Sequence, residues 1–339
     1  MDKQSFELEL TAAWRALSGT KTQEGWSVVS LSSESGIRCK AGRYFPDDTE
    51  AILIGFDCQI ENSYANWPET TGFSTVCLPS SNSSSISWIG LKRKPAGDVK
   101  MFFTMIVDIM ATISKNISAP NNMLLVTLLN RIRAWQHFME SSTQRGLSPA
   151  EVIGLCGELD FLIDLINEGV SGQTAVTAWR GPLGALHDFS FVGDGAVEVK
   201  SCCSDESFTV RISSAQQLDT NIVSPLYLVA FRYVYNEQGL YLRDRINSIR
   251  QLLSSDNVTL MSFDNRLLGL GVTSETSITH DDRFIQKEKR IYCVDDGFPR
   301  LSSSQLPVAI QNVKYSLDLS MINHSVSNIN ILIKTVRAD

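Results

Sequence analysis

The chain has 339 residues, of which 43% are hydrophobic and 20% are charged, and this balance excludes a largely disordered protein. Its length predicts two or three packed units. The net charge of -7 argues against a protein whose whole surface binds nucleic acid.

The composition also restricts the setting in which the protein works. The first residues carry acids and no long apolar run, so we expect no secretory signal. The most apolar run, 101–113, is too short to cross a bilayer, so we expect no membrane association. The seven cysteines form no CxxC pair, which predicts reduced thiols, a cytoplasmic protein and no structural zinc site.

The first 145 residues predict two consecutive domains. Short β-branched runs divided by turn residues indicate a β-rich domain at 1–95. Helical apolar spacing over 99–118 and 121–141, with Pro120 between the two segments, predicts a helical connector at 96–145. Residues 91–148 hold eight Lys or Arg against three acids. An exposed helix face explains this bias more simply than DNA contact, although contact stays open.

The next elements begin with a strong helix signal. Ser148-Pro149-Ala150-Glu151 combines a capping Ser, a Pro at the first helical position and a Glu at the third, and Gly169 favours an end near Asn167. Strands are predicted at 186–192 and 196–202, joined by the hairpin signal Gly193-Asp194-Gly195. We then expect a strand at 207–212, a short helix ending at 218, a strand at 226–235, a helix at 242–254, and short strands and turns beyond.

One acid on the first of these helices is predicted to point inward. Glu158 lies on the apolar stripe formed by Leu155, Leu159, Leu162 and Ile166. A buried carboxylate requires compensation, and a bound cation or a salt bridge to an arginine would each provide it. The residues around Glu158 leave these two alternatives open.

The predicted hairpin gathers further ionisable side chains. Alternation places Asp188 on one face of the first strand, and Glu198 and Lys200 on one face of the second. A divalent cation with oxygen ligands would relieve the repulsion between the carboxylates, and Mg²⁺ fits best, with Mn²⁺ as a substitute. Carboxylates, a metal and a lysine suit phosphodiester hydrolysis.

The acid-x-Lys string is weak evidence alone, because this chain contains a second example. Asp98-Val99-Lys100 has no acidic partner between Thr70 and Gly97, and it follows a Pro-Ala-Gly turn at a helix start. Asp98 is therefore predicted to cap a helix. The string at Glu198 differs because a helix, a hairpin and a matching Asp surround it.

In that context the residues resemble the PD-(D/E)xK nuclease superfamily, through Gly157-Glu158, then Asp188, then Glu198-Val199-Lys200. The segments GLSPAEVIGLCGELDFL, AWRGPLGALHDF, SSAQQL and FPRLSSSQLP are similar to the bacterial PD-(D/E)XK motif proteins, which are encoded beside restriction-like phage-defence genes. The resemblance implies an α/β (α+β) fold with a restriction-endonuclease-like core, a mixed β-sheet flanked by helices in the order αβββαβ. It assigns that core to 146–255 and a small α/β C-terminal subdomain to 256–339.

The resemblance also implies roles for individual residues. Asp188, Glu198 and the Val199 carbonyl would bind the metal, Lys200 would orient the attacking water, and Glu158 would bind a second metal or a metal-bound water. Gln217, with Gln216 as an equal alternative, would contact the site or the phosphate. His187 replaces the Pro of the motif and is expected to be structural. Trp179 and Arg180 lie in the loop before the hairpin. Two roles stay open for them: contact with DNA, or, for the arginine, a counter-charge to the nearby acids.

The leading hypothesis is therefore a Mg²⁺-dependent endodeoxyribonuclease that acts on DNA as the nuclease subunit of an anti-phage defence system. Protein partners from that system are expected, and a homodimer is an option. The first alternative is a DNA-binding or scaffolding subunit with a nuclease fold that is inactive without partners. The second is a repair or RNA-directed nuclease with the same core.

Overall fold

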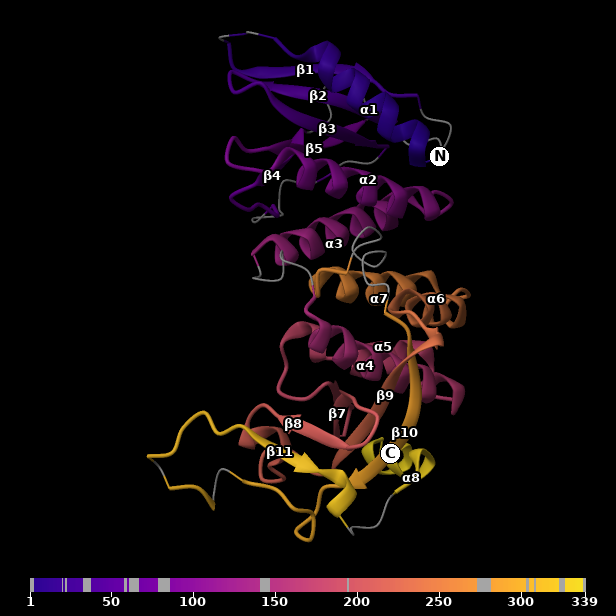
Figure 1. The fold of residues 1–339 in the computed structure, drawn as a ribbon. Helices are drawn as coiled ribbons and strands as arrows, with labels where there is room; N and C mark the ends of the chain where they lie inside the picture. The colour runs from indigo at the N-terminus through magenta and orange to yellow at the C-terminus, as the bar shows by residue number, and fades with distance from the viewer. Residues whose placement is uncertain are drawn as a thin grey trace. The chain divides into compact units, whose positions relative to one another are not determined.

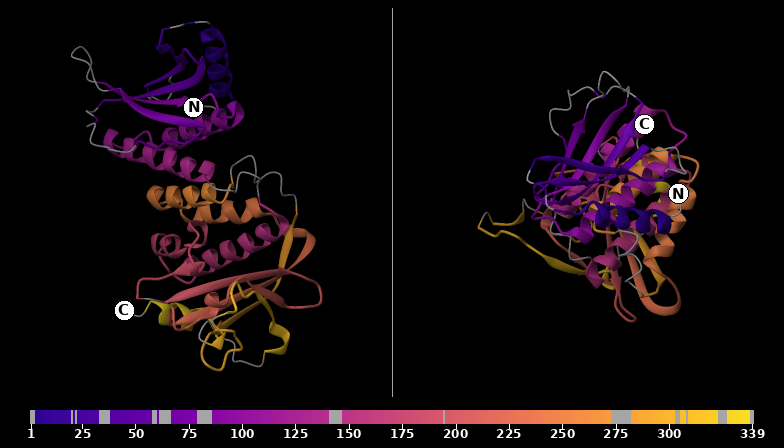
Figure 2. Two further views of the ribbon diagram at one scale, coloured as in Figure 1. Left: turned by 90° about the vertical axis from the view of Figure 1, so that its left-hand side faces the viewer. Right: turned by 90° about the horizontal axis from the view of Figure 1, so that it is seen from above.

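The computed structural model describes residues 3–337 apart from 20, 22, 33–37, 58–59, 61–66, 79–85, 141–146, 194, 273–281, 303–304, 308 and 323–326. The chain forms two compact units, Met1–Gln144 and Arg145–Asp339, each drawn in Figures 1 and 2. The inner boundaries of the four domains predicted from the sequence stay predictions. Among the described helices, none has the length and apolarity needed to cross a membrane.

The first unit combines one antiparallel sheet with helices. Helix α1 (Lys3–Leu17) precedes five strands in the order β1-β2-β3-β5-β4, and helices α2 (Val99–Lys115) and α3 (Asn121–Glu140) follow as predicted. Helix α1 was not predicted, although Phe6, Leu10 and Trp14 recur at helical spacing and are all buried. The strands are β1 (Gly25–Ser30), β2 (Arg38–Phe45), β3 (Thr49–Phe56), β4 (Phe73–Leu78) and β5 (Ser87–Arg93).

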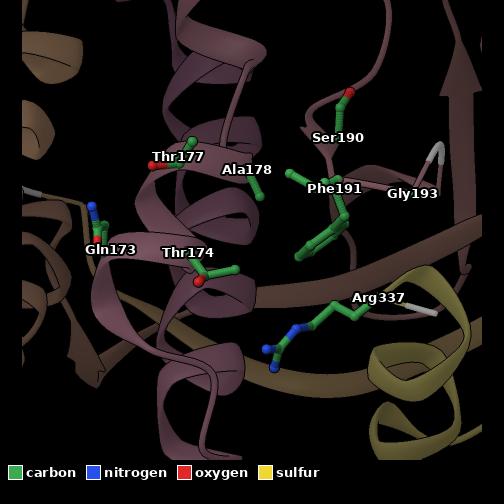
Figure 3. A pocket seen from close by; sticks show the side chains of 9 residues that line it. Gln173, Thr174, Thr177, Ala178, Ser190, Phe191, Gly193 and Arg337 are labelled. Carbon is green, nitrogen blue, oxygen red and sulfur yellow. The ribbon is translucent and has the colours of Figure 1, made fainter. Parts of the chain in front are cut away.

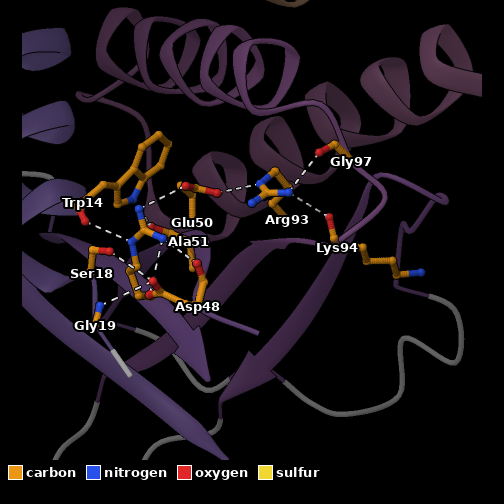
Figure 4. A network of polar contacts seen from close by, with 10 residues as sticks. Trp14, Ser18, Gly19, Asp48, Glu50, Ala51, Arg93, Lys94 and Gly97 are labelled. Atoms are coloured by element: carbon orange, nitrogen blue, oxygen red, sulfur yellow. Dashed lines mark hydrogen bonds and ion pairs between the residues drawn. The ribbon is translucent and has the colours of Figure 1, made fainter. Parts of the chain in front are cut away.

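Several basic side chains of 91–148 stabilise this unit internally. Arg93 donates to Glu50 at 2.5 Å within the polar network of Figure 4. Arg131 is buried and donates to both carboxylate oxygens of Asp108, at 2.7 and 2.8 Å. A guanidinium held in this way carries a structural role, so the local excess of basic residues overstates the charge available to DNA.

The second acid-x-Lys string is a helix cap, as predicted. The Asp98 carboxylate accepts a hydrogen bond from the Met101 backbone N–H at 2.7 Å and caps α2. This is the position where a carboxylate satisfies an otherwise unpaired N–H group.

The second unit is built on a mixed four-stranded sheet flanked by helices, which confirms the predicted fold class. Its strands lie in the order β10-β9-β7-β6; β7 runs parallel to β9, and the other pairs are antiparallel. These strands are β6 (Phe189–Ser190), β7 (Ala196–Cys203), β9 (Leu226–Leu240) and β10 (Phe284–Cys293). The helices are α4 (Pro149–Asn167), α5 (Gly172–Ala178), α6 (Leu242–Leu252), α7 (Asn257–Gly269) and α8 (Ile329–Val336).

Helix α4 begins and ends where the sequence predicts. Ser148 and Glu151 form the reciprocal capping box, and Gly169 has a φ of 88°, in the left-handed region. Farther along α4, the Asp160 carboxylate accepts hydrogen bonds from Arg245 at 3.0 Å and from the Tyr233 hydroxyl at 2.6 Å. These contacts hold α4 against β9 and α6.

Helix α4 also approaches strand β7 very closely at Gly157. A Cβ atom at this position would lie 2.0 Å from the Ser201 Oγ and 3.3 Å from a ring carbon of Phe231. A larger residue here would require the Ser201 hydroxyl to rotate away or the helix to shift. The approach brings the next residue, Glu158, to the sheet.

Other parts of the second unit differ from the prediction. Strand β6 has two residues instead of the predicted seven, because the Asp188 carbonyl accepts from the Arg180 and Gly181 N–H groups in a loop. Strand β8 (Thr209–Ile212) pairs with β11 (Tyr315–Asp318), outside the main sheet. Helices α7 and α8 lie where short strands and turns were expected. Within the predicted hairpin turn, Asp194 lies outside the described residues.

Candidate active site

Glu158 is positioned by α4 and by the indole of Trp179. The Trp179 Nε1–H donates to the Glu158 Oε2 at 2.7 Å, and the Glu158 side chain is half-buried. Its described partner is thus an indole, whereas sequence reasoning weighed a cation against an arginine. Trp179 itself is fully buried, and its ring packs against Phe263 inside the unit, which disfavours the DNA contact that the sequence left open for it.

Asp188 faces the same point as Glu158. A Cβ atom on Gly181 would lie 2.8 Å from the Glu158 Oε2 and 3.1 Å from the Asp188 Oδ1. Gly181 therefore packs directly against both carboxylates. The other Asp188 oxygen, Oδ2, accepts from the Val199 backbone N–H at 2.8 Å. Asp188 is therefore anchored to strand β7, and its charge acts on the Glu158 carboxyl group of α4.

Glu198 and Lys200 project from the same face of β7, as alternation predicts. The Lys200 Nζ donates to the Glu198 Oε1, and the Glu198 side chain is fully buried. The second oxygen, Oε2, is buried and has no hydrogen-bond partner among the described residues. An unpartnered buried carboxylate oxygen is costly, so it marks a place where a ligand would be stabilised.

The pKa values of these groups reflect the crowding of three carboxyl groups around one lysine. Burial, together with the charge of Asp188, raises the pKa of Glu158 to about 8, against the opposing effects of Trp179 and Lys200. Burial likewise raises the pKa of Asp188 and of Glu198. Burial alone would lower the pKa of Lys200, but Glu198 and Asp188 raise it above the ordinary value. Three carboxyl groups thus share one lysine, which leaves negative charge uncompensated when all are ionised.

The donor set fits a hard divalent cation in its chemistry. Asp188, Glu198 and the Val199 carbonyl offer only oxygen atoms, which Mg²⁺ prefers, and the unpartnered Glu198 Oε2 is available to it. Over the described ranges, however, no three Asp, Glu, His or Cys side chains lie close enough together to form a complete metal site. The metal roles of Asp188, Glu198, Val199 and Glu158 therefore stay predictions.

Two other predicted residues lie close to this group. His187 is buried, makes a backbone hydrogen bond with Gln217, and has a pKa lowered chiefly by burial and also by the charge of Lys200. The Gln217 side-chain oxygen accepts from the Ser213 N–H at 2.9 Å, while Gln216 is exposed. Gln217 thus has a local structural contact, and its role at the phosphate stays a prediction.

Two arginines lie at the segment that carries Trp179, and the sequence predicted only one of them as a candidate. Arg180 is exposed and directly precedes Gly181. Arg266, on α7, donates to the Trp179 carbonyl oxygen; burial and then the charge of Arg180 lower the pKa of Arg266 to about 10. Arg266 was missed because it is distant in sequence and lies in a segment for which no helix was predicted.

One comparison with known proteins gives a match. A family model described as "Putative PD-(D/E)XK family member, (DUF4420)" matches residues 10–320. No curated protein and no solved structure matches the chain significantly. The family match extends over both units and includes every candidate site residue.

Proposed function

Because the chain belongs to the PD-(D/E)XK family DUF4420, we propose that it is a metal-dependent endodeoxyribonuclease that hydrolyses DNA phosphodiester bonds. One observation carries the proposal: the side chains of Glu158, Asp188, Glu198 and Lys200, from α4 and the β6–β7 hairpin, lie near enough to shift one another's pKa values. Structural ion pairs usually balance their charges, whereas this group has three acids and one base. Such an imbalance favours a cation as the missing member.

The proposed roles follow from the contacts of each residue. Asp188, Glu198 and the Val199 carbonyl would hold Mg²⁺, or Mn²⁺ in its place, and the metal would supply Lewis-acid stabilisation of the phosphate and a more acidic bound water. Lys200, held by Glu198, presents positive charge where negative charge develops on the phosphate. Trp179 orients Glu158. Because the pKa of Glu158 is about 8, its carboxyl group is protonated in most molecules at neutral pH.

The biological setting is proposed on the resemblance alone. Similarity to proteins encoded beside restriction-like genes supports a cytoplasmic nuclease subunit in anti-phage defence, with partner proteins from the same system. One such site cuts one strand at a time, so a homodimer is a simple route to double-strand cleavage.

Cleavage assays on single variants test the active site. We expect Asp188→Ala and Lys200→Ala to reduce the Mg²⁺-dependent cleavage rate of plasmid DNA by at least about 100-fold, the usual scale for loss of an electrostatic catalytic group. Lys100→Ala is the matched control, because Lys100 belongs to the second acid-x-Lys string and is exposed. Cutting at the wild-type rate by both site variants would refute the proposal.

A second candidate is a DNA-binding or scaffolding subunit that keeps the fold without catalysis. It is favoured by the Glu198–Lys200 ion pair, which occupies one carboxylate oxygen, and by the lack of a complete metal site among the described residues. Titration calorimetry with Mg²⁺ and Mn²⁺ separates the two functions. Absence of metal binding at millimolar concentration, together with no cleavage when partner proteins are added, would refute the nuclease function and leave the DNA-binding or scaffolding subunit as the candidate.

A further inference from the structure

A cavity of about 500 Å³ lies between helix α5 and the β6–β7 hairpin (Figure 3). Its lining includes Gln173, Thr174 and Thr177 from α5, Phe191 from the hairpin, and Arg337 just beyond α8. The volume is within the range of pockets that bind small organic ligands. None of its nine lining residues is acidic.

The chemistry of the cavity suits a phosphorylated ligand. The Arg337 side chain extends into it toward α5 (Figure 3), and it makes no ion pair or side-chain hydrogen bond with any described residue. Thr174, Thr177 and Gln173 supply neutral donors and acceptors, and the exposed part of the otherwise buried Phe191 ring contributes to the cavity wall. A guanidinium, hydroxyl groups and an aromatic ring match the phosphate, sugar and base of a nucleotide.

The cavity shares its structural elements with the candidate active site. Ser190, in its lining, ends the edge strand β6, and Asp188 directly precedes that strand. Ala178, also in the lining, directly precedes Trp179, which holds Glu158. Two residues of extended chain span about 7 Å, so a ligand here lies close to the acids.

We propose that this cavity binds one nucleotide of a nucleic-acid strand beside the cleavage site, with its phosphate on Arg337 and its base and sugar against Phe191, Thr174 and Thr177. The proposal rests on the proposed nuclease function, because it identifies the ligand as part of the substrate. The group that the cavity would recognise is a nucleoside phosphate. It has two sources, a nucleic-acid strand and a free nucleotide, and the experiment below distinguishes them.

Binding of a short fluorescein-labelled single-stranded oligodeoxynucleotide to the full chain tests the proposal, by fluorescence anisotropy in EDTA at low salt. We expect Arg337→Ala to weaken binding about tenfold, the usual scale for a charge-assisted hydrogen bond, and Arg337→Lys to weaken it less. The double variant Thr174→Val/Thr177→Val should also weaken binding. The matched control is Lys334→Ala, which removes an exposed cation from the same helix outside the cavity lining and should change binding about twofold or less.

Each result has a defined consequence. Equal losses in Arg337→Ala and Lys334→Ala, or no binding by the wild type, overturn the proposal. Displacement of the strand by free dAMP at a similar concentration assigns the cavity to a free nucleotide and also overturns it. Because EDTA prevents metal-dependent cleavage, this assay is independent of the Asp188 and Lys200 assays. Arg337-dependent binding, together with no cleavage in separate assays with Mg²⁺ and partner proteins, would refute the nuclease function but retain the cavity as a strand-binding site.

Discussion

The Glu158 carboxyl group combines partial burial with two neighbouring acids, and this combination sets its protonation. Its oxygen accepts from Trp179, which favours the ionised form, but burial and Asp188 have the larger effect. Under the proposed function, a proton and a divalent cation would compete for the oxygens of Glu158.

This competition predicts a dependence of stability on pH. Because the folded-state pKa of Glu158 is raised from 4.5 to about 8, its favourable contribution is fully present below pH 4.5 and is lost as pH rises through about 8. Mg²⁺ should consequently raise the unfolding temperature more at pH 8.5 than at about pH 6, measured by differential scanning fluorimetry.

The control for this prediction is Glu158→Gln, which retains an oxygen that accepts from Trp179 but cannot titrate. We expect this variant to show a smaller loss of stability between pH 5 and about 8 in the absence of metal. Identical pH profiles for the variant and the wild type would show that Glu158 titrates normally in the folded protein.

Among the elements, the contact between α4 and β7 is a close approach that positions the candidate site. Gly157 faces Ser201, whose Oγ is buried and has no hydrogen-bond partner among the described residues. The hydroxyl therefore contributes little to stability, while its position excludes a side chain on the helix.

A double-mutant cycle tests this requirement. Gly157→Ala should lower the free energy of unfolding by about 1–3 kcal/mol through overpacking, although alanine is the better helix former. Ser201→Ala removes the atom that would overlap, so the double variant should recover most of the loss. Chemical denaturation measures all three variants. Additive effects would mean that the helix moves away from the strand at little cost.

At the scale of the whole molecule, the two units have separate cores. Phe102 on α2 is buried in the first, and Phe161 on α4 is buried in the second, where it contacts Phe189 beside the candidate site. Every residue of the proposed active site lies in the second unit. A ligand of that site should stabilise the second unit selectively.

Calorimetric unfolding of the full chain tests this separation. Phe102→Ala and Phe161→Ala should each lower the stability of one unit by about 3–5 kcal/mol, which identifies the two transitions. Mn²⁺ should then raise only the transition that Phe161→Ala lowers. A single transition that responds equally to both variants would show that the units unfold as one.

Local signals in the sequence determined several features correctly. The capping box at Ser148, the end of α4 at Gly169, the cap at Asp98 and strand β7 depend on neighbouring residues, so short windows were sufficient. Alternation along β7 also placed Glu198 and Lys200 on one face. These features, with the resemblance, predicted the fold class and the order of the motif.

Contacts between distant segments decided the rest. The indole partner of Glu158, the approach of Arg266 to Trp179 and the shortening of β6 depend on packing between elements far apart in the chain. The same holds for the pairing of β8 with β11. A sequence pattern specifies which side chains an element presents, but burial and partners arise only when the elements pack. The crowding of three carboxyl groups around one lysine is such a property, because it exists only where α4 and the hairpin meet.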